Sequence, residues 1–381
     1  MRVKLEDVCE RGTSSLMQKD IVDKNGKYPV YGASGRIGSM ETYQQEHQTV
    51  AVVKDGAGIG RTMLLPEKSS VIGTMQYLIP KNCIESEYLY YVVKYMHLEK
   101  YFSGATIPHI YFRDYKTEEF NLHDKTEQRE IVSTLKRIEA MISNRQEQLT
   151  KLDELVKARF VEMFENNTYP KVKVSTVCDF ITKGTTPPND LISEEYSSDK
   201  VPYLKVYNLS FNGELLFDTA PQYISENIHN GMLARSKVYP NDVLMNIVGP
   251  PLGKFSLVTD EFPEWNINQA IAIFRAKEKI NPKYLLSALM QPEVLNPFLR
   301  QAVGIRQLNL SLSQCRDLEI FLPPLSLQNQ FSAFVAEVDK SKLFVGSAAA
   351  HKPFDIGFFS QKHCATPCKR GIISSKHMIF H

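Results

Sequence analysis

The sequence predicts a mixed α/β protein that contains one kind of domain twice, with a long helix after each copy. Two observations carry this prediction. Short stretches recur in the same order in the two halves of the chain, and one long segment has the heptad repeat of a coiled coil. Alternating runs at residues 201–209 and 237–248 predict twisted, partly antiparallel sheets inside the domains. With 381 residues, the chain is long enough for two separate cores.

The recurring stretches identify the duplication. The matching pairs are residues 3–9 with 172–178, 49–61 with 242–254, 73–79 with 267–273, 87–96 with 283–292, and 112–131 with 312–331. In the last pair Gln128 falls on Gln328, and the same offset places Ile138 on Val338. The repeat distance is too long for a solenoid and indicates a duplicated domain.

The heptad predicts one long helix over residues 128–164, which would span roughly 55 Å at 1.5 Å per residue. The positions of its apolar seam are Ile131, Leu135, Ile138, Ile142, Arg145, Leu149, Leu152, Val156, Arg159 and Met163. This stripe is too narrow to lie flat on a sheet, so we expect a partner helix. The alternative is an amphipathic helix packed on its own domain.

The second long helix starts in the same register with Phe331, Val335 and Val338. The heptad then stops near Ser341, and Gly346 and later prolines break the pattern. We interpret this tail as a lost reading frame, whereas a genuine divergent tail is the alternative. The first helix would then pair with a stub of about ten residues and could associate with another chain.

Charge and cysteine content exclude few classes of protein. Lys and Arg number 45 and Asp and Glu 43, so DNA binding cannot be argued from composition. The six cysteines are scattered, which predicts free thiols, and Cys364 and Cys368 lack regular zinc-site spacing. The start of the chain has charges where a signal peptide is apolar, and no run is long enough to span a membrane, so we expect a cytoplasmic protein.

Several stretches resemble one protein family. They are residues 28–38 (YPVYGASGRIG), 52–61 (VVKDGAGIGR), 184–188 (GTTPP) and 321–331 (FLPPLSLQNQF). With the duplicated layout, they make the chain similar to the DNA-specificity subunits of type I restriction–modification systems over residues 1 to about 340. The resemblance implies two target recognition domains whose helices pair antiparallel and set the spacing of a bipartite DNA site.

The resemblance also implies partners and a division of the chain. The partners would be double-stranded DNA, two methyltransferase subunits and restriction–translocase subunits. S-adenosylmethionine, ATP and magnesium would be bound by those subunits, and this chain would bind no cofactor or metal. The implied parts are residues 1–125 (recognition domain 1), 126–166 (spacer helix), 167–327 (recognition domain 2), 328–342 (start of the second helix) and 343–381 (divergent tail).

No motif predicts catalysis. The loop at residues 54–62 lacks the first Gly and the Lys of a P-loop, because Asp55 and Arg61 stand there. This loop and its counterpart at 249–254 are either structural turns or places where Arg61 and Lys254 contact DNA phosphate. No methyltransferase or nuclease signature occurs, and His97, His109, His123 and His229 are single. These absences predict a non-catalytic subunit.

Base recognition requires polar side chains on exposed loops. In the first domain the candidates are Tyr31, Ser34, Arg36, Arg61, Thr106 and His109. In the second they are Lys183, Thr185, Thr186, Lys205, Tyr207, Asn208, Lys254, Arg306 and Gln307. Two other functions compete with the DNA-specificity subunit: a fragment of a fused restriction–methylation enzyme, and a coiled-coil scaffold or inactive remnant.

Overall fold

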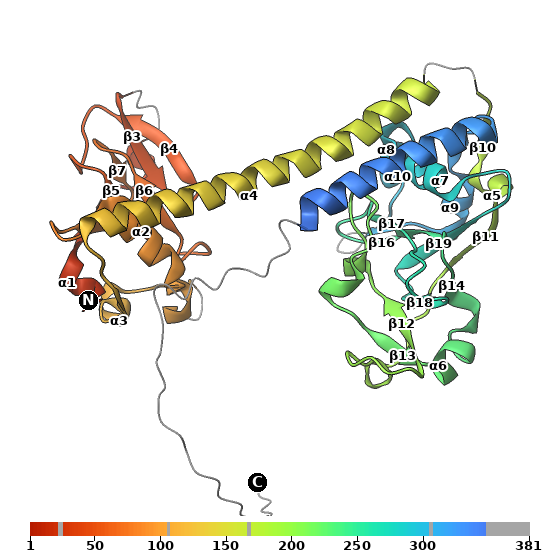
Figure 1. The fold of residues 1–381 in the computed structure, drawn as a ribbon, viewed down its shortest axis with the longest axis horizontal. Helices are drawn as coiled ribbons and strands as arrows, with labels where there is room; N and C mark the ends of the chain where they lie inside the picture. Colours follow the sequence, from red (N-terminus) through yellow and green to blue (C-terminus); the bar gives the residue numbers. More distant parts are fainter. Residues whose placement is uncertain (22–25, 105–106, 166–168, 305–307, 348–381) are drawn as a thin grey trace, which may run out of the picture. The chain divides into compact units, whose positions relative to one another are not determined.

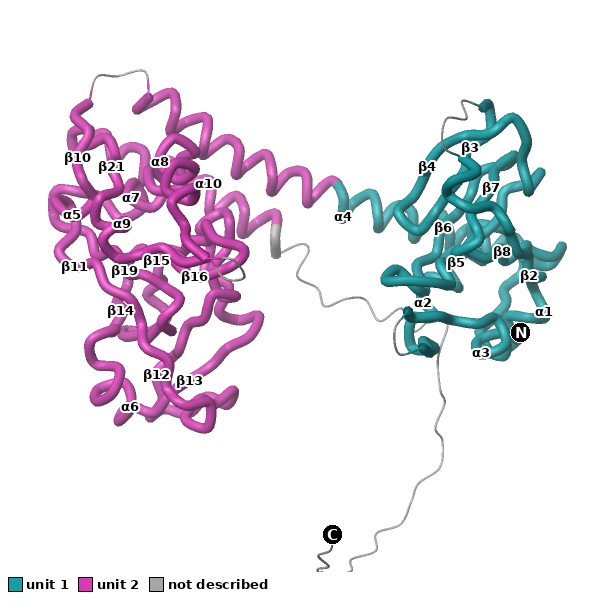
Figure 2. The backbone as a smooth tube through the Cα atoms, turned by 180° about the vertical axis from the view of Figure 1, so that it is seen from behind, with its two compact units in different colours: residues 1–143, 351–381 teal, residues 144–350 magenta. Residues whose placement is uncertain are grey.

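The computed structural model describes residues 1–21, 26–104, 107–165, 169–304 and 308–347 (Figure 1). These residues form two compact units, residues 1–143 (unit 1) and residues 144–347 (unit 2), which are coloured separately in Figure 2. Each unit has its own buried core, so the prediction of two mixed α/β domains is confirmed. Among the described residues, no helix is both long and apolar enough to span a bilayer.

Unit 1 combines short strands with three short α-helices and the start of a long one. Its elements are β1 (Arg2–Lys4), α1 (Leu5–Val8), β2 (Cys9–Thr13), β3 (Tyr28–Gly32), β4 (Gly35–Met40), β5 (Thr49–Val53), β6 (Thr62–Leu65), β7 (Ser70–Val71), β8 (Met75–Pro80), α2 (Ser86–Tyr95), α3 (Phe112–Tyr115), β9 (Glu119–Asn121) and α4 (Lys125–Phe160). The long helix α4 continues into unit 2 and ends in a π-helical segment, Val161–Glu165.

Unit 2 repeats this order with additional elements. They are β10 (Lys171–Lys173), α5 (Val174–Val177), β11 (Cys178–Lys183), β12 (Lys200–Leu204), β13 (Tyr223–Ser225), α6 (Glu226–Asn230), β14 (Lys237–Val238), β15 (Val243–Asn246), β16 (Val248–Gly249), β17 (Phe255–Leu257), β18 (Trp265–Ile267), β19 (Ile271–Ala276), α7 (Pro282–Leu289), α8 (Pro292–Leu299), β20 (Leu308–Asn309), α9 (Leu312–Asp317), β21 (Glu319–Phe321) and α10 (Leu325–Ser347).

The central sheets of the two units have the same topology. Unit 1 has the antiparallel order β2-β8-β5-β6, and unit 2 has β11-β19-β15-β17. In each unit the first strand pairs antiparallel with the strand just before the long helix, β1 with β9 and β10 with β21. The first and last strands of each domain therefore close on each other, and the repeats seen in the sequence correspond to this shared framework.

The units differ most in the segment between the first two strands of the central sheet in chain order, which are β2 and β5 in unit 1 and β11 and β15 in unit 2. We call residues 14–48 of unit 1 and residues 184–242 of unit 2 the divergent segments. Both contribute one strand that runs parallel to a neighbour, since β3 pairs with β7 and β12 pairs with β18. The segment of unit 2 is longer and adds α6 and β14. The same scaffold thus carries two different surfaces.

In unit 1, the first turns of α4 pack on the domain itself. Asp124 caps the helix, because its carboxylate accepts hydrogen bonds from the amides of Thr126 (2.9 Å) and Glu127 (3.0 Å). Val132 and Leu135 are buried in the core of unit 1, whereas Ile142 is 62% exposed. The prediction that the whole seam faces a partner helix is therefore wrong for the N-terminal third of α4, where the alternative holds.

In unit 2, α4 does have the predicted partner helix, α10 (Figure 1). The ring of Phe160 lies 5.5 Å from that of Phe331, and the guanidinium of Arg159 lies 5.8 Å from the ring centroid of Phe334. Earlier in α4, Asp153 forms an ion pair with Lys342, so the helices run antiparallel. Phe164 and Tyr284 complete an aromatic cluster that fixes both helices to the core.

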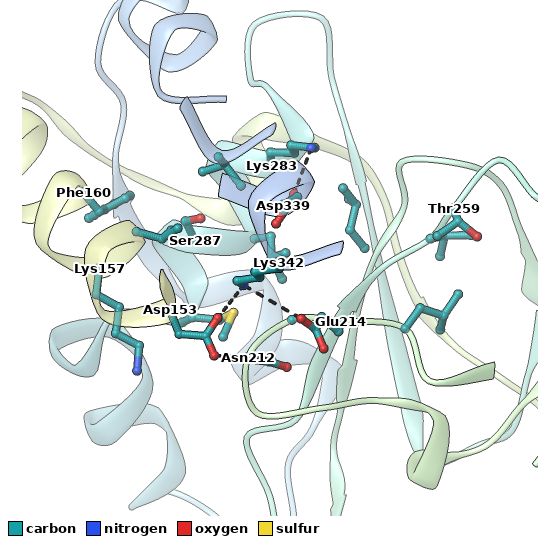
Figure 3. Close-up of a pocket in the computed structure, with 18 of the residues that line it drawn as sticks. Asp153, Lys157, Phe160, Asn212, Glu214, Thr259, Lys283, Ser287, Asp339 and Lys342 are labelled. Atoms are coloured by element: carbon teal, nitrogen blue, oxygen red, sulfur yellow. Dashed lines mark hydrogen bonds and ion pairs between the residues drawn. The ribbon is translucent and has the colours of Figure 1, made fainter. Parts of the chain in front are cut away.

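The second helix is longer than the stub predicted from the sequence. It continues to Ser347, five residues beyond the predicted end at 342, because residues 341–345 contain no helix breaker. Gly346 stands in the last turn, where the cost of glycine is low. Lys342 ties this extension to unit 2 through Asp153 and Glu214 (Figure 3). Of the tail predicted at 343–381, residues 343–347 belong to this helix and residues 348–381 lie outside the described residues.

The buried thiols agree with the prediction of free cysteines. Cys9, Cys83, Cys178 and Cys315 are free. Cys9 and Cys178 hold equivalent positions at the start of β2 and β11, and burial raises the pKa of each thiol to about 12. These two side chains therefore serve as small apolar core residues.

The aromatic cluster predicts a large stability difference between two Phe substitutions. Phe331→Ala should destabilise unit 2 by about 3–5 kcal/mol, because it leaves a cavity among buried rings. Phe211→Ala, at a site that is 58% exposed, should cost less than about 1 kcal/mol. Urea unfolding followed by the fluorescence of Trp265, the single tryptophan, reports on unit 2. Equal losses in the two variants would contradict the cluster's role.

Candidate nucleic-acid interface

In each unit, a Gly-rich loop follows a central strand and ends on a basic residue. Residues 54–61 follow β5, and residues 247–254 follow β15. Gly60 and Gly253, at matching positions, have backbone φ values of +81° and +89°. Such left-handed conformations strongly favour glycine. The two loops thus share a turn that places Arg61 and Lys254 at equivalent positions.

Several backbone amides of these loops donate hydrogen bonds within the protein. Those of Gly56, Gly60 and Arg61 donate to the carbonyls of Pro108 (2.9 Å), Val53 (2.9 Å) and Gly58 (3.1 Å). In unit 2, buried Asn246 holds the loop. Its amide group donates to the Pro251 carbonyl (2.8 Å) and its carbonyl accepts from the Lys254 amide (2.8 Å). Neither loop is arranged as a phosphate-binding P-loop, so contact with DNA would come from the side chains.

A second loop repeats beside the first in each unit. Ser103 and His109 exchange two backbone hydrogen bonds of 2.8 Å, and Val303 and Asn309 exchange bonds of 3.0 and 2.9 Å. In each unit, we call the Gly-rich loop and this second loop together the paired loops. They are joined at equivalent places, because the Ile110 amide donates to the Lys54 carbonyl and the Leu310 amide donates to the Ile247 carbonyl, both at 2.9 Å.

The sequence analysis did not identify the paired loops as a repeat. The signal was present, since the 200-residue offset that aligns residues 112–131 with 312–331 also aligns Gly104 with Gly304. Both glycines have positive φ values. Three predicted site residues, Thr106, Arg306 and Gln307, lie outside the described residues.

Arg61 connects the paired loops of unit 1 to its divergent segment. Its guanidinium donates a 2.8 Å hydrogen bond to the carbonyl of Ala33, in the turn between β3 and β4. Ser34 and Arg36, which flank that turn, are exposed, and Tyr31 lies half-buried on β3. The structure therefore brings Arg61 together with the predicted residues of the hairpin.

His109 is held by an acidic partner rather than presented freely. Its Nδ1 lies 2.7 Å from the carboxylate of Asp55 in the Gly-rich loop. Large exposed side chains lie along the same stretch, with Phe102 63%, Ile107 55% and Tyr111 46% exposed. The guanidinium of Arg113 stacks over Tyr111 at 4.6 Å. The sequence analysis missed these apolar residues because they follow no helix or strand period.

In unit 2, the predicted residues Lys183, Thr185 and Thr186 lie at the end of β11 and directly after it. Lys183 and Thr186 are exposed, whereas the Thr185 carbonyl accepts a 3.1 Å hydrogen bond from the Tyr203 hydroxyl. The Thr185 hydroxyl accepts two 3.2 Å bonds from Arg235 of the divergent segment. Arg235 is exposed and was not predicted, because nothing in its local sequence distinguishes it from other surface arginines.

Asn208 is a correction to the predicted set. Its side chain is fully buried, where it accepts from the Lys205 amide (2.9 Å) and donates to the Leu216 carbonyl (3.2 Å). It stabilises a turn and cannot present its amide to a base edge. Tyr207 beside it is 41% exposed, and partial burial raises the pKa of its hydroxyl. Lys205 is half-buried, and the Lys254 ammonium lies 5.7 Å from the exposed ring of Phe211.

The other single histidines have structural partners. His229 is buried between Glu264 (2.8 Å) and Asn266 (3.1 Å), and its burial lowers the pKa of the imidazole. His123 lies 2.7 Å from the Tyr88 hydroxyl. Across the described ranges, no three His, Cys, Asp or Glu side chains are grouped to hold a metal ion.

One cavity lies where the long helices pack on unit 2. It has a volume of about 1170 Å³ and lies in unit 2 between α4, α7 and α10 (Figure 3). Four of its charged side chains form pairs, Lys283 with Asp339 (3.4 Å) and Lys342 with Glu214 (3.8 Å). We therefore place the candidate interface at the paired loops and the divergent segments.

Comparisons with known proteins agree on one family. A family model described as the type I restriction modification DNA specificity domain matches residues 1–154 and 166–343. The type I restriction–modification S subunit from M. genitalium is 16% identical, with 91% of each chain covered and a TM-score of 0.56. A chain from a structure on complex assembly and conformational transition of the type I R-M system is 17% identical, with 92% of each chain covered and a TM-score of 0.52. These two likenesses concern the fold.

The repeated Gly-rich turn predicts a matched pair of stability losses. Gly253→Ala should destabilise unit 2 by about 1–2 kcal/mol, the cost of a left-handed residue that carries a Cβ. Gly60→Ala should destabilise unit 1 by more, because its Cβ would lie 2.7 Å from the Glu99 amide nitrogen. Hydrogen exchange of each unit in the full chain measures both. Unchanged exchange around Gly60 in the variant would contradict this loop geometry.

Proposed function

The chain belongs to the type I restriction modification DNA specificity family, and from that premise we propose that it recognises a two-part DNA sequence for catalytic partner subunits. It is the DNA-specificity subunit, without catalytic activity of its own. The observation that carries the two-part target is the duplication. Each unit carries the same paired loops on the same sheet, next to a divergent segment of its own.

A two-part target follows from the size of the recognition surfaces. A small domain that contacts a few base pairs discriminates weakly between DNA sequences. Two such domains joined by a stiff connection bind the sites together only when the half-sites have the right spacing. The connection here is α4, a helix of 36 residues that spans about 54 Å. The spacing between half-sites thereby becomes part of the specificity.

The duplication also suggests a division of labour. The two half-sites differ in bases but share a sugar–phosphate backbone, so elements that recur in both units fit the backbone. We assign Arg61 and Lys254 of the paired loops to phosphate contacts. The divergent segments differ between units and suit base recognition, through Ser34 and Arg36 in unit 1 and side chains such as Arg235 in unit 2.

The catalytic chemistry falls to partner subunits. DNA and the methyltransferase and restriction subunits of the complex are the partners of this chain, and two methyltransferase copies would match its two similar units. S-adenosylmethionine would be bound by the methyltransferases, and ATP and magnesium by the restriction–translocase subunits. We place this assembly in the cytoplasm.

The proposed function predicts a split methylation motif. When the chain is co-expressed with its neighbouring methyltransferase subunit, methylated bases mapped across the host genome should define two short half-sites with one fixed spacer. Cells with the methyltransferase alone are the control. A single uninterrupted motif, or no methylation that depends on this chain, would contradict the proposal.

The division of labour predicts two kinds of variant. Arg61→Ala and Lys254→Ala should each weaken binding to specific and to unrelated duplexes by a similar factor. Each should also reduce the slope of log K against log salt concentration by about 0.9, the value for one phosphate contact. Arg36→Ala should instead relax the sequence preference in one half-site, at about 1–3 kcal/mol for the preferred base. Binding titrations of the assembled complex at several salt concentrations measure both. A loss confined to one DNA sequence in Arg61→Ala would contradict its assignment to phosphate.

A further inference from the structure

Each long helix carries a fully buried glutamine in its first turns. Gln128 of α4 and Gln328 of α10 occupy matching positions, and both have 0% exposure. A buried amide is costly unless its donor and acceptor groups all find partners. Its presence at the same place in both units points to a role that the two units share.

Gln128 joins three parts of unit 1. Its carbonyl accepts from the Glu85 amide (2.9 Å), at the residue that precedes α2. Its amide group donates to the carbonyls of Cys83 (3.0 Å) and His123 (2.9 Å). The side chain therefore fastens the beginning of α4 to the beginning of α2.

Gln328 makes the same contacts in unit 2. Its carbonyl accepts from the Asn281 amide (2.8 Å), at the N-cap of α7, and its amide group donates to the carbonyls of Pro323 (2.8 Å) and Lys279 (3.4 Å). The next residue in each helix reinforces the junction, since Arg129 bonds to Glu85 (2.9 Å) and Asn329 bonds to Asn281 (3.0 Å).

A second attachment lies eleven residues further along each helix. Glu139 accepts from the Tyr91 hydroxyl (2.7 Å) and the Lys94 ammonium (2.6 Å), both on α2. At the matching position in α10, Asp339 pairs with Lys283 of α7 (3.4 Å). One attachment would allow the helix to pivot, whereas two attachments define its direction relative to the domain.

We propose that Gln128 and Gln328 are positioning residues that fix the direction in which the long helices leave the recognition domains, and so set the spacing between DNA half-sites. This inference rests on the proposed function. It assigns part of the specificity to side chains that touch no DNA.

The geometry amplifies a small loss of order at the glutamine. The two attachments are eleven residues apart, or about 16 Å along the helix. A loosening of about 1 Å at Gln128 pivots the helix about Glu139 and becomes about 2 Å at Phe160, which lies about 32 Å beyond the pivot. That displacement is more than half of the 3.4 Å between successive bases along a DNA strand. Loss of the Gln128 contacts therefore corresponds to roughly one base pair of spacing.

The test compares the methylation motifs of the assembled complex with and without the Gln128 side chain. Gln128→Ala should keep both half-sites but extend methylation to motifs whose spacer is one base pair longer or shorter. The level of methylation at these motifs should come within about tenfold of the level at the native spacer, a factor like that which one mismatched base pair costs. Gln146→Ala, an exposed glutamine on the same helix, is the matched control and should keep the single native spacer.

The outcomes separate positioning from stability. A purely structural role would lower methylation at every site in proportion to the amount of folded complex, with the spacer distribution unchanged, and that result would overturn the inference. If Gln128→Ala fails to fold, Glu139→Ala removes the second, half-buried attachment instead and should broaden the spacer in the same way. Absence of methylation with the unaltered chain would overturn the proposed function itself.

Discussion

The structure depends on one constraint: α4 has to bury its apolar stripe on two different partners. Near its start, Val132 and Leu135 enter the core of unit 1, and near its end Phe160 enters the core of unit 2 against α10. An isolated helix of this length would not be stabilised by propensity alone, because helices in water gain most of their stability from such packing. A single continuous helix thus belongs to both cores.

The internal duplication distinguishes the features that both units share from those particular to one unit. Features that recur in both units with the same geometry serve a need common to both: the paired loops, the buried glutamine and the closure of the first strand on the last. Features that differ, above all residues 14–48 and 184–242, serve needs particular to one unit. For a chain that recognises two unlike half-sites on one continuous backbone, this separates the base-contacting surface from the surface that fits any DNA.

Much of the framework could be predicted from the sequence, because matching stretches and heptad spacing are local signals. The long helix, the need for a partner helix and the repeated domain followed from them, whereas the antiparallel direction of the partner was implied by the family resemblance. The end of α10 could not be predicted from the heptad, because the helix continues through residues 343–347 after the heptad has stopped. The burial of Asn208 and the hydrogen bond between Arg235 and Thr185 depend on tertiary contacts. A prediction based on polar residues in loops therefore included Asn208 wrongly and missed Arg235.

The central claim is that each unit recognises its own half-site through its divergent segment. The most direct measurement exchanges residues 184–242 for the corresponding segment of another member of the family and maps the methylated motif of the assembled complex. The account predicts that the second half-site changes, while the first half-site and the spacer stay the same. A change in the first half-site, or a motif that stays unchanged in full, would contradict it.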